Sequence, residues 1–335
     1  MRQWVDQLAD VTGVRDLEQL DLSLVGLLCE TLAPRRACVY ATVSDGDDTR
    51  WYLRASQTPG ETLPNSDALT LRMDELPLRA ERPLLARCAD EQRLCSAPLE
   101  QGGTASAFAL FDDPGMMGVL LLETEATLSA AQLRLVGSLL RFYANFRCLV
   151  HDNERDLLTG LYNRKPFDEH FDRALDTVAV PADESAPSSW LAVFDLDHFK
   201  RVNDLFGHLV GDEVLLLVGR LLRQSFRFSD KVFRFGGEEF VLLLRGADAE
   251  DSLRVLERFR ERVATHEFPQ VGQMSVSIGY TALKPDDTPH SALERADRAV
   301  YAAKEGGRNR VCHFERLVSE GRLAPQEAGG SVDFF

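Results

Sequence analysis

A chain of 335 residues is too long for one average domain and fits two domains of about 150 residues each. Hydrophobic residues make up 44% of it and charged residues 27%, a composition that excludes disordered and collagen-like chains. The formal net charge of -15 opposes broad attraction to nucleic acid, so no nucleic-acid partner is expected, and a polyanionic ligand would need a local basic site.

The sequence gives no indication of a membrane span or of export. Its longest clean apolar run, residues 116–122, falls far short of the ~20 residues that cross a bilayer. The first ten residues contain Asp6 and Asp10, and no short apolar block ends in a small-residue cleavage site. Six scattered cysteines without a C-x-x-C pair indicate reduced, packed thiols rather than a disulfide frame or a zinc site. Together these features predict a cytoplasmic protein.

In chain order, the first half predicts an α+β domain with an antiparallel sheet. Apolar residues at helical spacing, from Val5 through Leu28, predict an opening helix that Pro34 stops. Short strand-like runs follow, and turns such as Asp113-Pro114-Gly115 separate them. The predicted strands are residues 37–43, 51–55, 105–111 and 118–123.

A long helix is predicted from Ser129 to about Arg155. Its apolar positions alternate four and three residues apart, as in a helix-helix seam. These positions are Leu135, Leu139, Phe142, Phe146 and Leu149. Two heptads do not separate a dimer stalk from a helix packed on its own domain, so both interpretations stay open.

The second half predicts a domain of interleaved strands and helices, from near Arg155 to Phe314. Residues 181–189 form a loop rich in Pro and Ser, and the Gly-rich tail after Phe314 is expected to be loose at its end. Helices are predicted to start near Leu209, Glu250 and Ser291. The predicted strands are residues 190–194, 232–234, 239–244, 274–281 and 310–314.

Two carboxylates, Asp195 and Asp197, stand at the end of the first of these strands. Hard divalent ions are usually held by one or two carboxylates together with substrate phosphates, so this pattern suits a nucleotide site. Solvated strand-end aspartates are nevertheless commoner than metal ligands. On its own the pair is therefore a weak signal.

The helical stretch that follows divides its residues between two faces. Phe199, Val202 and Phe206 share one face and are expected in the core. Lys200 could hold a phosphate as a point charge and Asn203 could recognise the edge of a base, although a solvated helix surface explains each as well.

Asp212 permits two interpretations. It is well placed to cap a helix from Val214 to Leu222. Its carboxylate could instead accept from the ring N–H and the exocyclic amine of guanine.

Gly236-Gly237-Glu238-Glu239 is the most informative stretch, because it lies between two short strand patterns. The glycine pair predicts a tight hairpin without a Cβ to hinder a phosphate. Adjacent side chains on a strand point to opposite faces, so one of the two glutamates can face Asp195 and bind metal while the other points away.

Taken together, these motifs resemble the GGDEF family of diguanylate cyclases. The resemblance covers the whole second half, with a Gly-Gly-Glu-Glu-Phe signature. It implies a palm-like antiparallel sheet flanked by helices and the condensation of two GTP into cyclic di-GMP and pyrophosphate. The segments that carry it are residues 156–165, 194–212, 236–240, 275–279, 296–304 and 307–309.

The resemblance also implies a role for each matching position. Asp195, Glu238 and the Leu196 carbonyl would ligate Mg²⁺, with Mn²⁺ as an alternative, and Glu238 would help to deprotonate the ribose 3′-hydroxyl. Asn203 and Asp212 would recognise guanine. Glu239 and Asp197 would support the catalytic groups. The positions expected around the triphosphate are Lys200, Lys304, Arg308, Gly236 and Gly237.

Arg227 and Asp230 form an R-x-x-D segment that five residues separate from Gly236, which is the spacing of the family's inhibitory site for its product. Arginine would grip a phosphate or a guanine edge while aspartate accepts from guanine. Arg258 stands where some relatives add a second arginine to this site. The resemblance therefore implies product inhibition by cyclic di-GMP.

Since each domain of this family holds one GTP in a half-site, the resemblance implies a homodimer, and the long helix could transmit a signal from the first domain. That domain resembles a GAF sensory module in layout alone. A PAS-like module or a ligand-free dimerising domain remains open, and no motif names a sensory ligand or protein. The expected organisation is residues 1–128 for the sensory domain, 129–155 for the helix, 156–315 for the cyclase and 316–335 for the tail.

Two other functions stay open. One is a catalytically silent receptor that binds cyclic di-GMP at Arg227 and Asp230, against which the intact acids argue. The other is a cyclase that uses another nucleotide pair, since base choice depends on Asn203 and Asp212.

Overall fold

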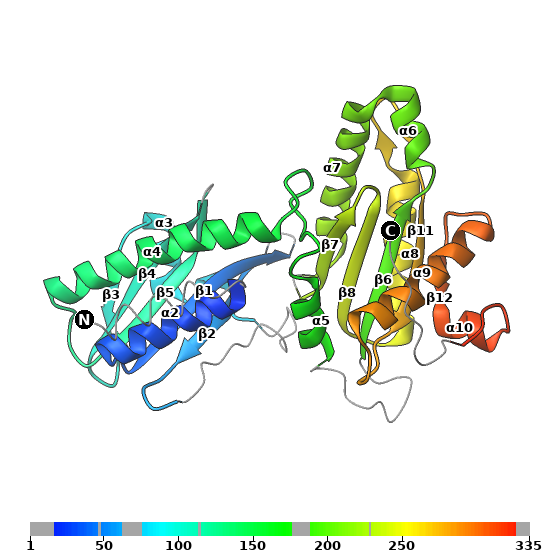
Figure 1. Cartoon of the computed structure of the whole chain (residues 1–335). Coiled ribbons are helices and arrows are strands. Elements are labelled where there is room, and N and C mark those ends of the chain that lie inside the picture. Colours follow the sequence, from blue (N-terminus) through cyan, green and yellow to red (C-terminus); the bar gives the residue numbers. More distant parts are fainter. Residues whose placement is uncertain are drawn as a thin grey trace. The chain divides into compact units, whose positions relative to one another are not determined.

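The computed structural model describes residues 17–45, 48–61, 76–112, 115–175, 188–227 and 229–325. They belong to two compact units, Met1–Asn153 and Glu154–Phe335 (Figure 1). The start of the predicted opening helix, the turn at residues 113–114, most of the 181–189 loop and the last ten residues lie outside the described ranges.

The first unit is built on a five-stranded antiparallel sheet in the order β2-β1-β5-β4-β3. The four strands predicted here are confirmed, whereas β3 and α3 were not predicted. The elements are α2 (Leu17–Leu32), β1 (Arg36–Asp45), β2 (Asp48–Gln57), the 3₁₀ turn η2 (Arg79–Glu81), α3 (Pro83–Glu91), β3 (Cys95–Pro98), β4 (Thr104–Asp112), β5 (Gly115–Thr124) and α4 (Ala130–Glu154).

Both faces of this sheet are apolar, because strand residues alternate between two covered sides. Val39 and Leu120 pack in one core cluster with residues of α2 and α4. Trp51 belongs to a second cluster on the other face, with Leu85 and Cys88 of α3. The two clusters hold the sheet between helices (Figure 1).

The helix α4 uses part of its predicted seam for its own domain. Leu139 is buried in the core of the first unit, and Leu135, Phe142 and Phe146 are partly buried against that core. Leu149 is 66% exposed. Packing within the domain therefore accounts for four of the five seam positions, and one apolar position stays uncovered near the end of the helix.

The second unit contains a five-stranded sheet in the order β12-β11-β6-β8-β7. It is antiparallel except for the parallel pair β11–β12. All five predicted strands are confirmed, whereas α5, α10 and the short β9–β10 pair were not predicted. The elements are α5 (Phe167–Leu175), β6 (Ser188–Leu196), α6 (Phe199–Phe206), α7 (His208–Ser225), β7 (Lys231–Gly236), β8 (Glu239–Ala247), α8 (Ala249–Thr265), β9 (Glu267–Phe268), β10 (Gly272–Gln273), β11 (Val276–Ala282), α9 (Pro289–Glu305), β12 (Val311–His313) and α10 (Phe314–Ser319).

Helices cover both faces of this sheet as well. On one side Phe194 packs in a cluster with Val218 of α7 and Phe259 of α8. On the other side Val193 shares a cluster with Phe171 of α5 and Ala296 of α9. Successive residues of the central strand β6 thus serve opposite cores, and the same alternation sets where its terminal carboxylates point.

Three further expectations have clear outcomes. Phe199 and Val202 are buried as predicted, but Phe206 is 42% exposed, so its placement in the core was wrong. All six cysteines are free and five of them are buried. No helix among the described residues is long and apolar enough to cross a bilayer.

Candidate functional site

The end of β6 meets the turn between β7 and β8. Asp195 lies opposite Glu239 in the antiparallel register, and the Leu196 N–H donates to the Glu238 carbonyl over 3.4 Å. The predicted hairpin is confirmed, since Gly236 pairs with Glu239 across it. Gly237 has a φ of +49°, in the left-handed region that favours glycine, which explains the residue type at this turn.

Lys304, in the last turn of α9, completes this cluster. Its Nζ lies 2.7 Å from Oδ2 of Asp195. Residues far apart in the chain therefore meet at one point: a strand end, a hairpin turn and a helix end.

The carboxylates of this cluster are not fully compensated. Burial raises the pKa of Asp195, against the opposing effect of Lys304. Burial and then the charge of Asp195 raise the pKa of Glu238. The pKa of Asp297 on α9 is also raised, by desolvation and by the charges of Glu239 and Asp195. The site concentrates negative charge and would gain from a cation.

These side chains could supply only part of the ligands of a divalent metal ion. Across the described ranges, no three His, Cys, Asp or Glu side chains come together as a metal-binding group. Two carboxylates that repel each other still match the way Mg²⁺ is usually held, with the remaining ligands supplied by water and substrate phosphates. The residues present fit such an ion.

Asp197 has a different environment from Asp195, two positions earlier on the strand. Its oxygens accept from the Ser275 hydroxyl at 2.6 Å, the Ser277 hydroxyl at 2.7 Å and the Asn309 N–H at 3.1 Å. The Nε of Arg308 lies 4.0 Å away. Asp197 thus ties β6 to β11 and to the loop after α9, which positions Arg308 near the acidic cluster.

Asn203 and Asp212 are brought to neighbouring positions by the packing of α6 on α7. A Cβ at Gly211 would collide with the Asn203 amide, so only glycine leaves room for this side chain. Asp212 does not cap a helix as predicted: α7 already begins at His208, because Gly207 ends α6 and starts α7. Asp212 is therefore an exposed residue of the second turn, next in the chain to Gly211, against which the Asn203 amide packs. Lys200 is exposed on the same helix as Asn203.

The R-x-x-D segment is a closed turn. The Asp230 carboxylate is buried and accepts the Arg227 N–H at 2.8 Å and the Arg245 N–H at 3.5 Å. Burial raises the pKa of Asp230 to about 6. Arg227 is exposed, and the Arg258 guanidinium donates to the Ser225 carbonyl at 3.0 Å, two residues before Arg227. Asp230 orders the turn that presents Arg227.

Sequence reasoning gave no role to Arg234, which links the start of the second unit to the glycine turn. Its Nη1 lies 3.0 Å from the Asp156 carboxylate, and its Nη2 donates to the Gly237 carbonyl at 2.9 Å. Asp156 also accepts from the backbone and hydroxyl of Thr159. The adjacent motifs were visible in the sequence, but their contact depends on the fold.

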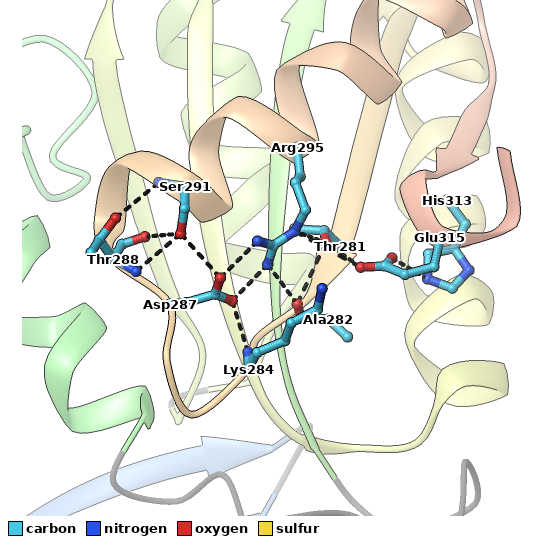
Figure 2. A network of polar contacts seen from close by, with 9 residues as sticks. All are labelled: Thr281, Ala282, Lys284, Asp287, Thr288, Ser291, Arg295, His313 and Glu315. Atoms are coloured by element: carbon cyan, nitrogen blue, oxygen red, sulfur yellow. Dashed lines mark hydrogen bonds and ion pairs between the residues drawn. The ribbon is translucent and has the colours of Figure 1, made fainter. Parts of the chain in front are cut away.

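The helix α9 is held by a buried polar network, shown in Figure 2. Arg295, which is 2% exposed, donates to both oxygens of Asp287 at 2.7 and 2.6 Å and to the Thr281 hydroxyl at 2.9 Å. Thr281 in turn donates to Glu315, at the start of α10. The network fixes α9 against β11 (Figure 2), and the last turn of α9 carries Lys304, which pairs with Asp195.

A strand-end aspartate, a glycine turn with a glutamate and a helix-end lysine thus meet in the second unit. Residues 153–310 match the family model "Diguanylate cyclase, GGDEF domain". The second half of the chain is therefore a GGDEF domain, as the sequence motifs predicted.

Curated relatives agree with this assignment. Diguanylate cyclase DgcP of Pseudomonas aeruginosa is 41% identical over 159 residues, which are 47% of this chain and 23% of the relative. Diguanylate cyclase DgcM of Escherichia coli is 38% identical over 164 residues, 49% of this chain and 39% of the relative. The response regulator PleD of Caulobacter vibrioides is 39% identical over 162 residues, 47% of this chain and 35% of PleD. The chain thus spans well under half the length of these relatives.

Among solved structures, the GGDEF domain of DgcB from Caulobacter crescentus in complex with c-di-GMP is 38% identical. The match covers 48% of this chain and 96% of that one, with a TM-score of 0.44.

Proposed function

We propose that this protein is a diguanylate cyclase that joins two GTP molecules into cyclic di-GMP. The observation that carries the proposal is the meeting of Asp195, Glu238 and Lys304 at one point of the GGDEF domain. In each of two steps the 3′-oxygen of one nucleotide would bond to the α-phosphorus of the other. The bond from that phosphorus to pyrophosphate would break, and the hydroxyl proton would leave to a base.

Asp195, Glu238 and the Leu196 carbonyl would hold Mg²⁺, or Mn²⁺ in its place. When bound, the metal would lower the pKa of the attacking hydroxyl and neutralise charge on the leaving pyrophosphate. Glu238, in the turn beside Asp195, is the candidate to accept the hydroxyl proton. Glu239 and Asp197 would support these groups.

The substrate would be bound by groups around this centre. Asn203 and Asp212 supply an amide and a carboxylate at neighbouring positions, which can match the edge of guanine. Lys304 and Arg308 carry positive charge beside the strand end, and Lys200 adds another on α6. The open turn at Gly236 and Gly237 would allow phosphate to approach the backbone.

The test is incubation of the full chain with GTP and Mg²⁺, with nucleotides separated by chromatography. We expect cyclic di-GMP from the parent and from Glu261→Gln, a surface change on α8, and none from Glu238→Gln. Formation of product by Glu238→Gln at the parental rate would overturn the assignment of Glu238. Absence of product from the parent, together with binding of cyclic di-GMP, would favour the silent receptor.

We further propose that two copies place their half-sites face to face and that α4 connects this arrangement to a GAF-like sensory unit. An opening helix, an antiparallel sheet and a closing helix support that likeness. The continuity of α4 into the second unit, where Asp156 contacts Arg234, supports a mechanical connection. The sensed ligand or protein partner would act through this helix.

Product inhibition at Arg227, with Arg258 nearby, is part of the proposal. The exposed Arg227 guanidinium can grip a phosphate, while Asp230 orders its turn. Arg227→Ala is expected to relieve inhibition by added cyclic di-GMP and to leave the initial rate within about twofold, because a surface change away from the metal has little effect on the chemistry. Arrest of this variant at the parental product level would contradict the inhibitory site.

A further inference from the structure

A cleft of about 520 Å³ opens beside α6 in the GGDEF domain. Its walls come from α6, from Ala264 of α8 and from the segment that leads through β10 into β11. Ligand pockets for small molecules usually have about 300–1,000 Å³ and combine an apolar lining with a few polar groups. The cleft therefore has the size of a small-molecule site.

The lining of the cleft combines apolar and basic side chains. Val202 and Leu205 of α6 and Met274 are among its apolar residues. Arg201 and His198 also line it, both are exposed, and in the described part of the chain no side-chain hydrogen bond or ion pair engages either of them. In a chain with a formal charge of -15, two such basic side chains beside apolar residues are a local site for an anion.

One acid, Asp197, also lines the cleft. Its oxygens accept from Ser275, Ser277 and the Asn309 N–H, and Arg308 lies 4.0 Å away. The negative charge of Asp197 is therefore largely compensated by its own neighbours, whereas the positive charge of Arg201 is not. The uncompensated charge of Arg201 favours the binding of a negative group in the cleft.

We propose that this cleft binds a small amphipathic anion. Arg201 would hold its carboxylate, sulfonate or phosphate group, for which a planar guanidinium offers two parallel donors, and His198 would add a third donor. The apolar body would lie against Val202, Leu205 and Met274. Loss of the charge-assisted contact with Arg201 is expected to weaken binding about tenfold, equivalent to about 1.4 kcal/mol.

Occupancy of the cleft would bear on the nucleotide site through α6. Lys200 and Asn203 lie on that same helix, three residues apart and so on one face, while Arg201 and Leu205 lie four apart on another. A ligand that holds the second face would fix the helix that carries the candidate nucleotide contacts. This consequence, unlike the binding itself, rests on the proposed cyclase function.

The binding test uses 8-anilinonaphthalene-1-sulfonate as the probe, because it joins a sulfonate to an aromatic body. The full chain is titrated by fluorescence. We expect a saturable component that weakens about tenfold in Arg201→Gln and is lost in Ala264→Trp, which fills the cleft from α8. Arg220→Gln, an exposed arginine of α7 outside the cleft, should bind as the parent does.

Parental affinity in Arg201→Gln, or an equal loss in Arg220→Gln, would overturn the site, and Arg201→Gln alone decides this even if Ala264→Trp does not fold. The rate of product formation from GTP is then measured with and without saturating probe. A change in the parent that is absent in Arg201→Gln supports the coupling through α6, and an unchanged rate overturns it. If no product forms at all, the proposed function fails while the binding result stands.

Discussion

A buried carboxylate of the first unit, Asp21, and one of the second unit, Asp195, have opposite surroundings. In the first unit Asp21, 2% exposed, accepts from Arg54 Nε at 2.7 Å, from the Tyr143 hydroxyl and from Arg147 at 3.3 Å. Burial opposes the ionisation of Arg54, yet the charge of Asp21 raises the pKa of Arg54. Two cations and a hydroxyl thus compensate the charge of one carboxylate, and these contacts join α2, β2 and α4.

In the cluster around Asp195 in the second unit, the carboxylates outnumber the cations. Asp195 has Lys304 as its one ion-pair partner among the described residues, and Glu238 lies close enough to Asp195 for the pKa of Glu238 to rise. A buried carboxylate whose charge is fully compensated, such as Asp21, stabilises a fold, because its removal leaves its buried cationic partners without a counter-charge. Two carboxylates with too little compensating positive charge, such as Asp195 and Glu238, can instead bind a cation or take part in chemistry. From this difference we predict a structural role for Asp21 and a functional role for Asp195, without reference to sequence motifs.

The largest effect should come from Asp195→Asn. We expect product formation from GTP to fall by about 10³-fold or more, because a metal ligand contributes several kcal/mol to the transition state. The free energy of unfolding of the second unit should stay equal or rise, since the raised pKa of Asp195 means that its ionised form is unfavourable in the fold. Activity and urea unfolding are measured on the same preparation. A marked loss of stability would show that Asp195 is structural after all.

The reverse is expected of Asp21→Ala. It should lower the free energy of unfolding of the first unit by about 3–5 kcal/mol, because Arg54 and Arg147 lose their buried partner. Asp90→Ala is the matched control: Asp90 pairs with Arg79 at the surface, and such pairs contribute about 0–1 kcal/mol. Urea midpoints for the two variants test the contrast. An equal loss of unfolding free energy in the two variants would contradict the distinction between a buried, fully compensated carboxylate and a surface ion pair.

Asp230 is an intermediate case, buried and bonded to backbone N–H groups but without an ion pair among the described residues. Its pKa rises from 3.8 to about 6 in the fold. Its contribution to stability is therefore fully present below pH 4 and is lost as the pH rises through about 6, a change of about 3 kcal/mol. The difference in unfolding free energy between the parent and Asp230→Asn, measured from pH 4 to pH 7, should follow this curve. A difference that does not change with pH would refute the assignment.

Much of this contrast could be predicted in outline from the sequence, but not in its details. The apolar run at residues 190–194 predicted the strand that leads to Asp195, and Gly236-Gly237 predicted the turn that carries Glu238. Asp21 gave no signal, because its partners come from β2 and α4, 33 and 122 residues away for Arg54 and Tyr143. Long-range pairing of this kind follows from the fold and leaves no local pattern.

The errors in the second unit have the same origin. Asp212 had the residue type of a helix cap, but the chain reverses earlier, at Gly207, where φ is +84°. The helix α7 begins at His208, close to the start predicted near Leu209, so Asp212 lies inside it, and Phe206 at the end of α6 is exposed. A glycine that both ends one helix and begins the next is hard to recognise from spacing alone.

The smallest effect is expected at an uncharged side chain of the second unit, Asn203. Asn203 in the candidate site is seated by packing against Gly211 rather than by compensation of charge, and Gly211→Ala would push its amide aside. We expect the KM for GTP to rise about tenfold, equivalent to about 1.4 kcal/mol of base recognition, with kcat changed far less. Gly137→Ala on α4, where a Cβ meets no atom within 4 Å, is the control. If kcat falls instead and KM does not move, the packing of α6 on α7 governs the chemistry rather than recognition of the base. Asn203 would then belong with Asp21 and Asp197, among the polar residues that hold the structure in place.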